Sequence, residues 1–132
     1  MKADNFKQLR NKDSMKKEEY RIPVNLFPFG FADELATGMH INEEVVSRCV
    51  EAISTSFEPT EDFNRNITSY ALKNILEARL GEEISNGAFI AAMLAAGYKY
   101  ERVKCTPNCY FNVSQKGIER IREINKGNKM TT

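Results

Sequence analysis

The sequence predicts an α+β fold that is mainly α-helical, and three observations lead to that prediction. Residues 69–80 and 85–96 both carry apolar side chains at helical spacing, and a short turn separates them. Residues 98–104 and 109–113 flank the turn signal Thr106-Pro107-Asn108, which is typical of a β-hairpin. The order helix, turn, helix and hairpin is that of a winged helix-turn-helix. We therefore expect a winged helix-turn-helix core with an N-terminal helical extension.

The two central helices have the clearest start and stop signals. Thr68 or Ser69 can cap the first helix, and Gly81 can end it in the left-handed conformation. Ser85 can cap the second helix, which Gly97 ends. The apolar positions of these helices and of their neighbours predict a core that contains Val46, Val50, Ile53, Leu72, Ile75, Leu76, Phe89, Met93, Phe111, Ile118 and Ile121.

One further helix is expected before the central pair and one after it. Asn42 can cap a helix over 43–57, and Ser114 can cap a last helix over 115–125. Residues 57–66, between the first of these helices and the central pair, are interpreted as an acidic connector.

The chain is expected to contain one globular domain between flexible ends. We expect a flexible basic tail over 1–19, an N-terminal extended arm and helix packing on the core over 20–66, a winged-helix-like domain over 67–126 and a flexible tail over 127–132. The segment 20–31 combines aromatic residues with proline and glycine, which breaks both a long helix and a central strand. We interpret it as an arm that inserts aromatic rings into the core, and the alternative is an aromatic docking segment for a partner.

Composition and charge narrow the functional class. The 132 residues contain no apolar run long enough to span a membrane, and the N-terminus lacks the apolar region of a secretory signal. Three cysteines fit a reducing compartment, so a cytoplasmic location is expected. The net charge of +1 hides an uneven distribution: residues 22–66 carry −6, while 1–21 carry +3 and 67–132 carry +4. The middle of the chain is acidic and both flanks are basic.

The chain shows no arrangement of residues typical of an enzyme, and neither enzymatic activity nor a cofactor is expected. No glycine-rich nucleotide-phosphate motif is present, and the single histidine, His40, stands before a helix cap. Cys105 and Cys109 have a spacing that could share Zn²⁺ with Cys49 and His40. The preferred interpretation is that Cys49 is a core residue and that the other two cysteines face each other across the hairpin as small residues. No metal site is predicted.

The second central helix is unsuited to reading a DNA sequence. It contains no charged residue between Ser85 and Gly97, and only Ser85 and Asn86 offer hydrogen-bonding side chains. Its other face consists of alanines, which can approach a helix or a DNA backbone closely. Any nucleic-acid binding should therefore rely on phosphate contacts, and the candidate residues are Lys73, Ser85, Asn86, Lys99, Arg102 and Lys104.

Several short motifs support this interpretation through a resemblance. They are Ser69-Tyr70 with Leu72-Lys73, Ser85-Asn86-Gly87 with Phe89, Ala92 with Ala96-Gly97-Tyr98, and Asn108 with Tyr110-Phe111-Asn112. In these motifs the chain resembles small proteins of phages and mobile elements, with a module similar to the winged-helix domain at the C-terminus of phage and plasmid primase-helicases. The resemblance covers roughly residues 66–114, about a third of the chain. It implies a mobile-element origin and a nucleic-acid-handling or host-interacting role, without the ATPase or primase domain of those enzymes.

Two functional hypotheses follow from the sequence. The first is a non-enzymatic accessory protein that binds DNA largely independently of sequence, through phosphate contacts. The second is a protein-interaction module that binds a host or phage protein, such as an anti-CRISPR inhibitor of a host defence nuclease, with its acidic segment 33–62. A shared positive face on the hairpin and helix would favour the first, and a dominant acidic patch the second.

Overall fold

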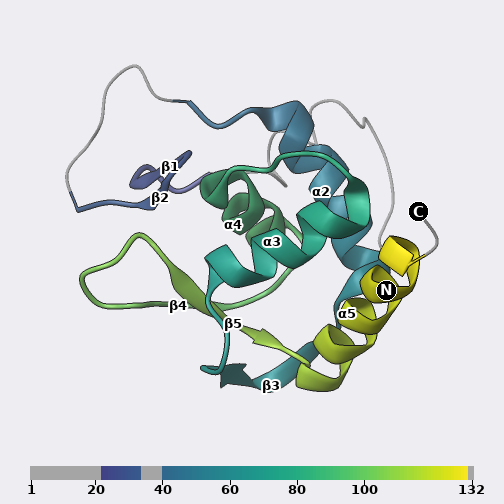
Figure 1. Ribbon diagram of the computed structural model, residues 1–132. Helices are drawn as coiled ribbons and strands as arrows, with labels where there is room; N and C mark the ends of the chain where they lie inside the picture. The colour runs from purple at the N-terminus through teal and green to yellow at the C-terminus, as the bar shows by residue number, and fades with distance from the viewer. Residues whose placement is uncertain (1–21, 34–39, 131–132) are drawn as a thin grey trace, which may run out of the picture.

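The computed structural model describes residues 22–33 and 40–130, and within this part the fold is α+β with four helices and two small antiparallel sheets (Figure 1). The basic tail expected over 1–19 lies outside the described residues. The helices are α2 (Glu43–Ser56), α3 (Ser69–Leu80), α4 (Asn86–Ala95) and α5 (Gln115–Met130). None of the helices in the described ranges combines the length and apolar character needed to cross a bilayer.

The helices begin at the residues that the sequence predicts. Asn42 accepts the backbone N–H groups of Glu44 and Val45 at 2.9 and 3.3 Å at the start of α2. Thr68, rather than Ser69, caps α3 by accepting the N–H of Ala71. These side chains satisfy donors that have no partner within the first helical turn.

Two later caps follow the same rule, and one helix is longer than expected. Ser85 caps α4 and Ser114 caps α5, with the N–H of Gly117 donating to Ser114 Oγ at 3.1 Å. Gly81 ends α3 in the left-handed conformation with φ 71°. Helix α5 continues to Met130, so the expected end near residue 125 is wrong. Residues 127–130, which we expected to belong to a flexible tail, are part of this helix.

The larger sheet has the strand order β3-β5-β4, with both pairings antiparallel. The strands are β3 (Pro59–Asn64), β4 (Tyr100–Arg102) and β5 (Cys109–Val113). The predicted hairpin is therefore confirmed as β4–β5, although β4 is shorter than the expected 98–104. The interpretation of 57–66 as a connector is wrong, because most of it forms β3. Strand β3 also pairs with β5 across the boundary that we expected between 20–66 and 67–126.

Helix α4 lies at the centre of the core. It packs against α2 and α3, while α5 packs against α3 on the side away from α4 (Figure 1). The ring of Phe89 is fully buried and meets the rings of Phe57 and Phe111 edge-on, with centroids 6.4 and 6.2 Å away. The predicted core is confirmed, except that Val50 is only partly buried.

The N-terminal arm forms a second, two-stranded sheet against α4. Strand β1 (Leu26–Phe27) pairs with β2 (Gly30–Phe31), and the hairpin lies beside α4 in Figure 1. Phe27 and Phe31 are buried, as the interpretation of an arm inserting aromatic rings expects. This hairpin belongs to the core of the domain and is not an appendage, because Leu26 and Phe31 are part of the same hydrophobic cluster as α4.

Candidate functional site

The helix that a helix-turn-helix would place in a DNA groove is inaccessible in this protein. Every residue of α4 from Asn86 to Met93 is buried. The arm covers the beginning of the helix, where the N–H of Gly87 donates to the carbonyl oxygen of Pro28 at 2.8 Å. The alanine face that we expected to approach a helix or DNA backbone is also internal, with Ala91 and Ala92 both buried. Neither groove insertion nor phosphate binding at this helix N-terminus is possible without removing the arm.

Asn86, one of the predicted nucleic-acid contacts, has a structural role instead. Its amide nitrogen donates to the carbonyl oxygen of Phe29 at 3.0 Å and to Asn108 Oδ1 at 2.9 Å. It thereby joins α4, the arm and the β4–β5 loop. Ser85, the other candidate on this helix, is exposed, and its hydroxyl oxygen accepts the N–H of Ala88 at 3.1 Å as the cap.

Lys73 does not lie on a surface shared with the hairpin lysines, as the first functional hypothesis requires. It is only 7% exposed. Its Nζ lies 3.3 Å from Glu77 Oε2 and 4.4 Å from the centroid of the Tyr70 ring. The ion pair and the cation–π contact stabilise the partly desolvated ammonium group. Lys73 therefore acts as a packing residue of α3 and is not available to a phosphate.

The β4–β5 hairpin keeps two basic residues available. Lys99 and Lys104 are exposed, and no carboxylate in the described part of the chain pairs with either. Arg102 is held by Asp33, with Nη1 2.9 Å from Oδ1, and its guanidinium lies 5.3 Å from the centroid of the Phe31 ring. Lys99 and Lys104 thus precede and follow β4 as cations without a carboxylate partner among the described residues.

The acidic residue of β4 is neutralised by an arginine from the neighbourhood of β3. Glu101 accepts two hydrogen bonds from Arg65, at 2.7 and 2.8 Å. This bidentate contact lowers the pKa of Glu101, so the carboxylate stays charged and paired at neutral pH. The hairpin with its ion-pair partners therefore has four cations (Arg65, Lys99, Arg102 and Lys104) and two carboxylates (Asp33 and Glu101), a net charge of +2.

Two exposed aromatic rings accompany these cations, and the sequence did not single them out. Tyr100 is 40% exposed and stacks on the buried ring of Phe31 with centroids 5.0 Å apart. Phe29, in the β1–β2 turn, is 43% exposed and stacks on Phe27 at 5.8 Å. The position of Tyr100 between Lys99 and Glu101 is a signal that could have found the first ring. Nothing local to Phe29 indicates that the arm brings it beside the hairpin.

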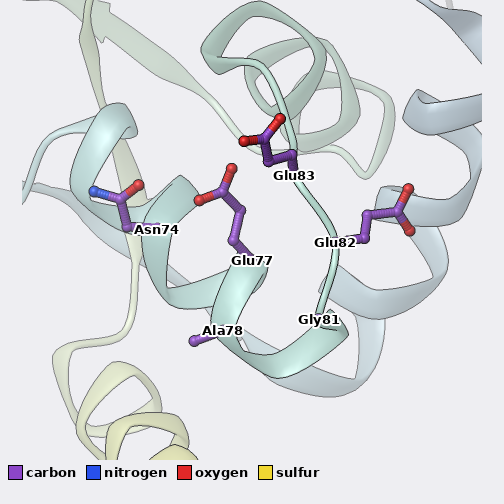
Figure 2. Close-up of a pocket in the computed structure, with 6 residues that line it drawn as sticks. All are labelled: Asn74, Glu77, Ala78, Gly81, Glu82 and Glu83. Carbon is purple, nitrogen blue, oxygen red and sulfur yellow. The ribbon is translucent and has the colours of Figure 1, made fainter.

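A surface pocket of about 400 Å³ lies at the end of α3 and is lined by Asn74, Glu77, Ala78, Gly81, Glu82 and Glu83 (Figure 2). Glu77 is already engaged, because its Oε2 accepts the N–H of Ile84 at 2.8 Å besides pairing with Lys73. Glu82 points away from Glu77 in Figure 2 and pairs with Arg48 of α2 at 2.7 Å, which lowers the pKa of its carboxyl. The pocket therefore lacks a paired acid and base with a nucleophile.

The cysteines are dispersed and do not form a common site. Cys49 and Cys109 are buried, whereas Cys105 is exposed in the turn with a positive φ of 64°. Cys109 lies opposite Arg102 in the sheet register, so the expectation that Cys105 and Cys109 face each other across the hairpin is wrong. Within the described ranges, no cluster of three or more histidine, cysteine or acidic residues could hold a metal ion.

The acidic segment supplies a second set of exposed charges, called the acidic set below. Its exposed carboxylates belong to α2, to β3 and to the link between them: Glu43, Glu44, Glu51, Glu58, Glu61 and Asp62. Among the described residues only Glu58 of this set has a cation within ion-pair distance, with Arg120 Nη2 3.5 Å away. The other five carboxylates of the set have no ion-pair partner among the described residues.

Comparison of the chain with protein-family models, with curated proteins and with solved structures finds no match.

Proposed function

We propose that this protein is a non-enzymatic accessory protein that binds nucleic acid through phosphate contacts made by the β4–β5 hairpin. The observation that carries the proposal is which charged side chains of the hairpin are paired and which are left exposed. Glu101 of the hairpin and Asp33 of the arm are both paired with arginines, while Lys99 and Lys104 remain exposed and unpaired within the described chain. Two exposed ammonium groups without carboxylate partners among the described residues favour a polyanion and provide no base-specific hydrogen-bond pattern.

The arrangement of the elements supports a winged-helix core as the carrier of this activity. The predicted order of two helices followed by a hairpin is retained, and β3 extends the hairpin into a three-stranded sheet. In such a core the hairpin acts as the wing. Because the arm covers α4, the wing is the part of the motif left for nucleic acid.

A binding experiment with a matched charge control tests the proposal. Fluorescence anisotropy would measure the affinity of the full chain for two duplexes of unrelated sequence over a range of salt concentrations. Lys99→Ala with Lys104→Ala should weaken binding to both duplexes equally. It should also flatten the log-log salt dependence by about 0.9 for each phosphate that the variant no longer neutralises.

The control variant removes the same charge elsewhere. Lys116 and Arg122 are exposed on α5 and have no ion-pair partner among the described residues. Lys116→Ala with Arg122→Ala should leave the affinity close to that of the parent. Equal losses in the two double variants, or no binding by the parent at low salt, would contradict a site on the hairpin.

The exposed carboxylates of the acidic set, most of them without an ion pair among the described residues, support a second candidate function: docking on a basic groove of a host or phage protein as an inhibitor would. Electrostatic complementarity of this kind sets the association rate and orientation of a complex. Glu43→Lys, Glu44→Lys and Glu51→Lys together should abolish capture of such a partner from nuclease-treated host lysate. The hairpin double variant should leave capture intact, which separates the two functions.

A further inference from the structure

We infer that the nucleic acid bound by the hairpin is single-stranded, with unpaired bases stacking on Tyr100 and Phe29 while Lys99 and Lys104 contact the phosphates. This inference rests on the proposed function and names its ligand class. Single-strand binding combines a positively charged track for the backbone with exposed aromatic rings for the bases. Both parts are present around β4.

The two rings are held in fixed positions. Tyr100 lies nearly parallel to the ring of Phe31, at 15°, and Phe29 lies at 24° to the ring of Phe27. Phe27 and Phe31 are themselves buried, 5% and 2% exposed. Each exposed ring therefore has one face supported by the core, and the entropy lost when a base stacks on it is small.

Hydrogen bonds join the arm to the hairpin. The N–H of Phe31 donates to the carbonyl oxygen of Pro107 at 2.9 Å, and Asn86 bonds to both Phe29 and Asn108. These hydrogen bonds connect the arm turn that carries Phe29 to the loop that follows Lys104. Along the chain, Lys99 directly precedes Tyr100 and Lys104 follows two residues after Arg102.

The same geometry is poorly suited to duplex DNA. The bases of a duplex are stacked on one another and are read only at their edges, from the grooves. Helix α4, the element that would enter the major groove, is buried. Exposed aromatic rings gain stacking energy only from bases whose faces are free.

The chain offers a direct readout of stacking because it contains no tryptophan. Tyr100→Trp makes the introduced indole the sole tryptophan, and its fluorescence should be quenched by an oligothymidylate of roughly 20 nucleotides, longer than typical single-strand sites. Ile124→Trp is the matched control. It places the indole on α5 at a position that is 40% exposed, as Tyr100 is, and its fluorescence should not change.

Affinities give the second measurement, made on the full chain by anisotropy with labelled oligothymidylate, oligouridylate and a duplex of the same length. We expect the parent to bind at least one single strand about tenfold more tightly than the duplex. Tyr100→Leu, which keeps an apolar cover over Phe31, should weaken single-strand binding about tenfold. Its unchanged affinity for the duplex would show that the variant is folded.

The outcomes distinguish this inference from the function on which it rests. Equal affinity for single strands and duplex, with no quenching in Tyr100→Trp, would overturn single-strand binding and leave the phosphate-driven proposal in place. No binding to any of the three probes at low salt would overturn both. The comparison of oligothymidylate with oligouridylate shows whether the bound strand is DNA or RNA.

Discussion

The backbone of Gly87 lies directly against the carbonyl oxygen of Phe27, so that a Cβ atom at position 87 would overlap that oxygen. This close approach brings the N-terminal arm near enough to α4 for the N–H of Gly87 to donate to the carbonyl oxygen of Pro28. The absence of a side chain at position 87 thus lets the arm cover the N-terminal end of α4.

Gly87→Ala should separate the arm from α4. We expect a loss of about 2–4 kcal/mol in the free energy of unfolding, from overpacking against backbone and the weakened hydrogen bond to Pro28. Urea denaturation followed by circular dichroism measures the change. Gly127→Ala is the control, because among the described residues a Cβ at that helical position meets no atom within 4 Å apart from its chain neighbours and its own helix backbone. It should stabilise the protein by about 0.5–1 kcal/mol, and a similar gain in Gly87→Ala would contradict the close approach of the arm.

Phe89→Ala should be among the most destabilising single substitutions in the core. The ring is fully buried and contacts Phe57 and Phe111, so its removal leaves a cavity that the rigid surroundings cannot fill. We expect a loss of about 3–5 kcal/mol, measured by urea denaturation. Leu80→Ala, at the exposed end of α3, should cost under about 1 kcal/mol. Comparable losses in the two variants would refute the central position of Phe89.

The protein should lose stability in alkaline solution. Burial raises the pKa of Cys49 to about 11 and that of Cys109 and Tyr98 to about 12. The ordinary values are 9.0 for cysteine and 10.0 for tyrosine, so between pH 9 and 12 the folded chain holds more protons than the unfolded chain. The stability that these three groups contribute is therefore fully present below pH 9 and is lost as the pH rises towards the folded pKa values. Denaturation at pH 8 and pH 10 should differ by on the order of 1 kcal/mol per buried thiol.

The same burial predicts which thiol reacts. Cys105 is exposed, whereas Cys49 and Cys109 are buried, so a thiol reagent should modify one cysteine rapidly in the folded protein and three after denaturation. Cys105→Ser should abolish the rapid reaction. Rapid labelling that persists in this variant would show that a buried cysteine is accessible.

Neutralising the carboxylates of the hairpin should strengthen nucleic-acid binding. Asp33→Asn releases Arg102, and Glu101→Gln releases Arg65, so each variant raises the local net charge by one. Each should tighten binding at low salt by roughly two- to tenfold, and the gain should decline as salt screens the added charge. Glu123→Gln, on α5, changes the total charge equally and should have little effect. Equal gains in all three variants would indicate that only total charge matters.

The sequence predicted the helices well because their signals are local. Asn42, Thr68, Ser85 and Ser114 each satisfy backbone donors within their own first turn, and such caps can be recognised without knowledge of the fold. Strand β3 lacks a comparable signal. It is mostly exposed and polar, and it is a strand because β5 supplies its hydrogen-bond partners from about 50 residues further along the chain.

The candidate site was predicted less completely, because tertiary contacts decide which polar residues are accessible. Lysine is a residue type that is usually exposed, so its type alone does not predict that Lys73 is buried. Only its helical spacing from Tyr70 and Glu77 indicates that it interacts with side chains of its own helix. The burial of Asn86 depends on an arm more than fifty residues away, which no pattern around position 86 reveals. Lys99 and Lys104 are exposed, as predicted.

The central position of β5 also constrains how the protein matures during synthesis. Both neighbours of this strand, β3 and β4, precede it in the chain, so neither has a sheet partner until residue 113 has left the ribosome. The pairing of β3 with β5 must in addition close a loop that contains α3 and α4. Non-local pairing of this kind slows folding. Strand β3 therefore stays unpaired while α3 and α4 are synthesised, and its open edge is prone to aggregation until β5 follows.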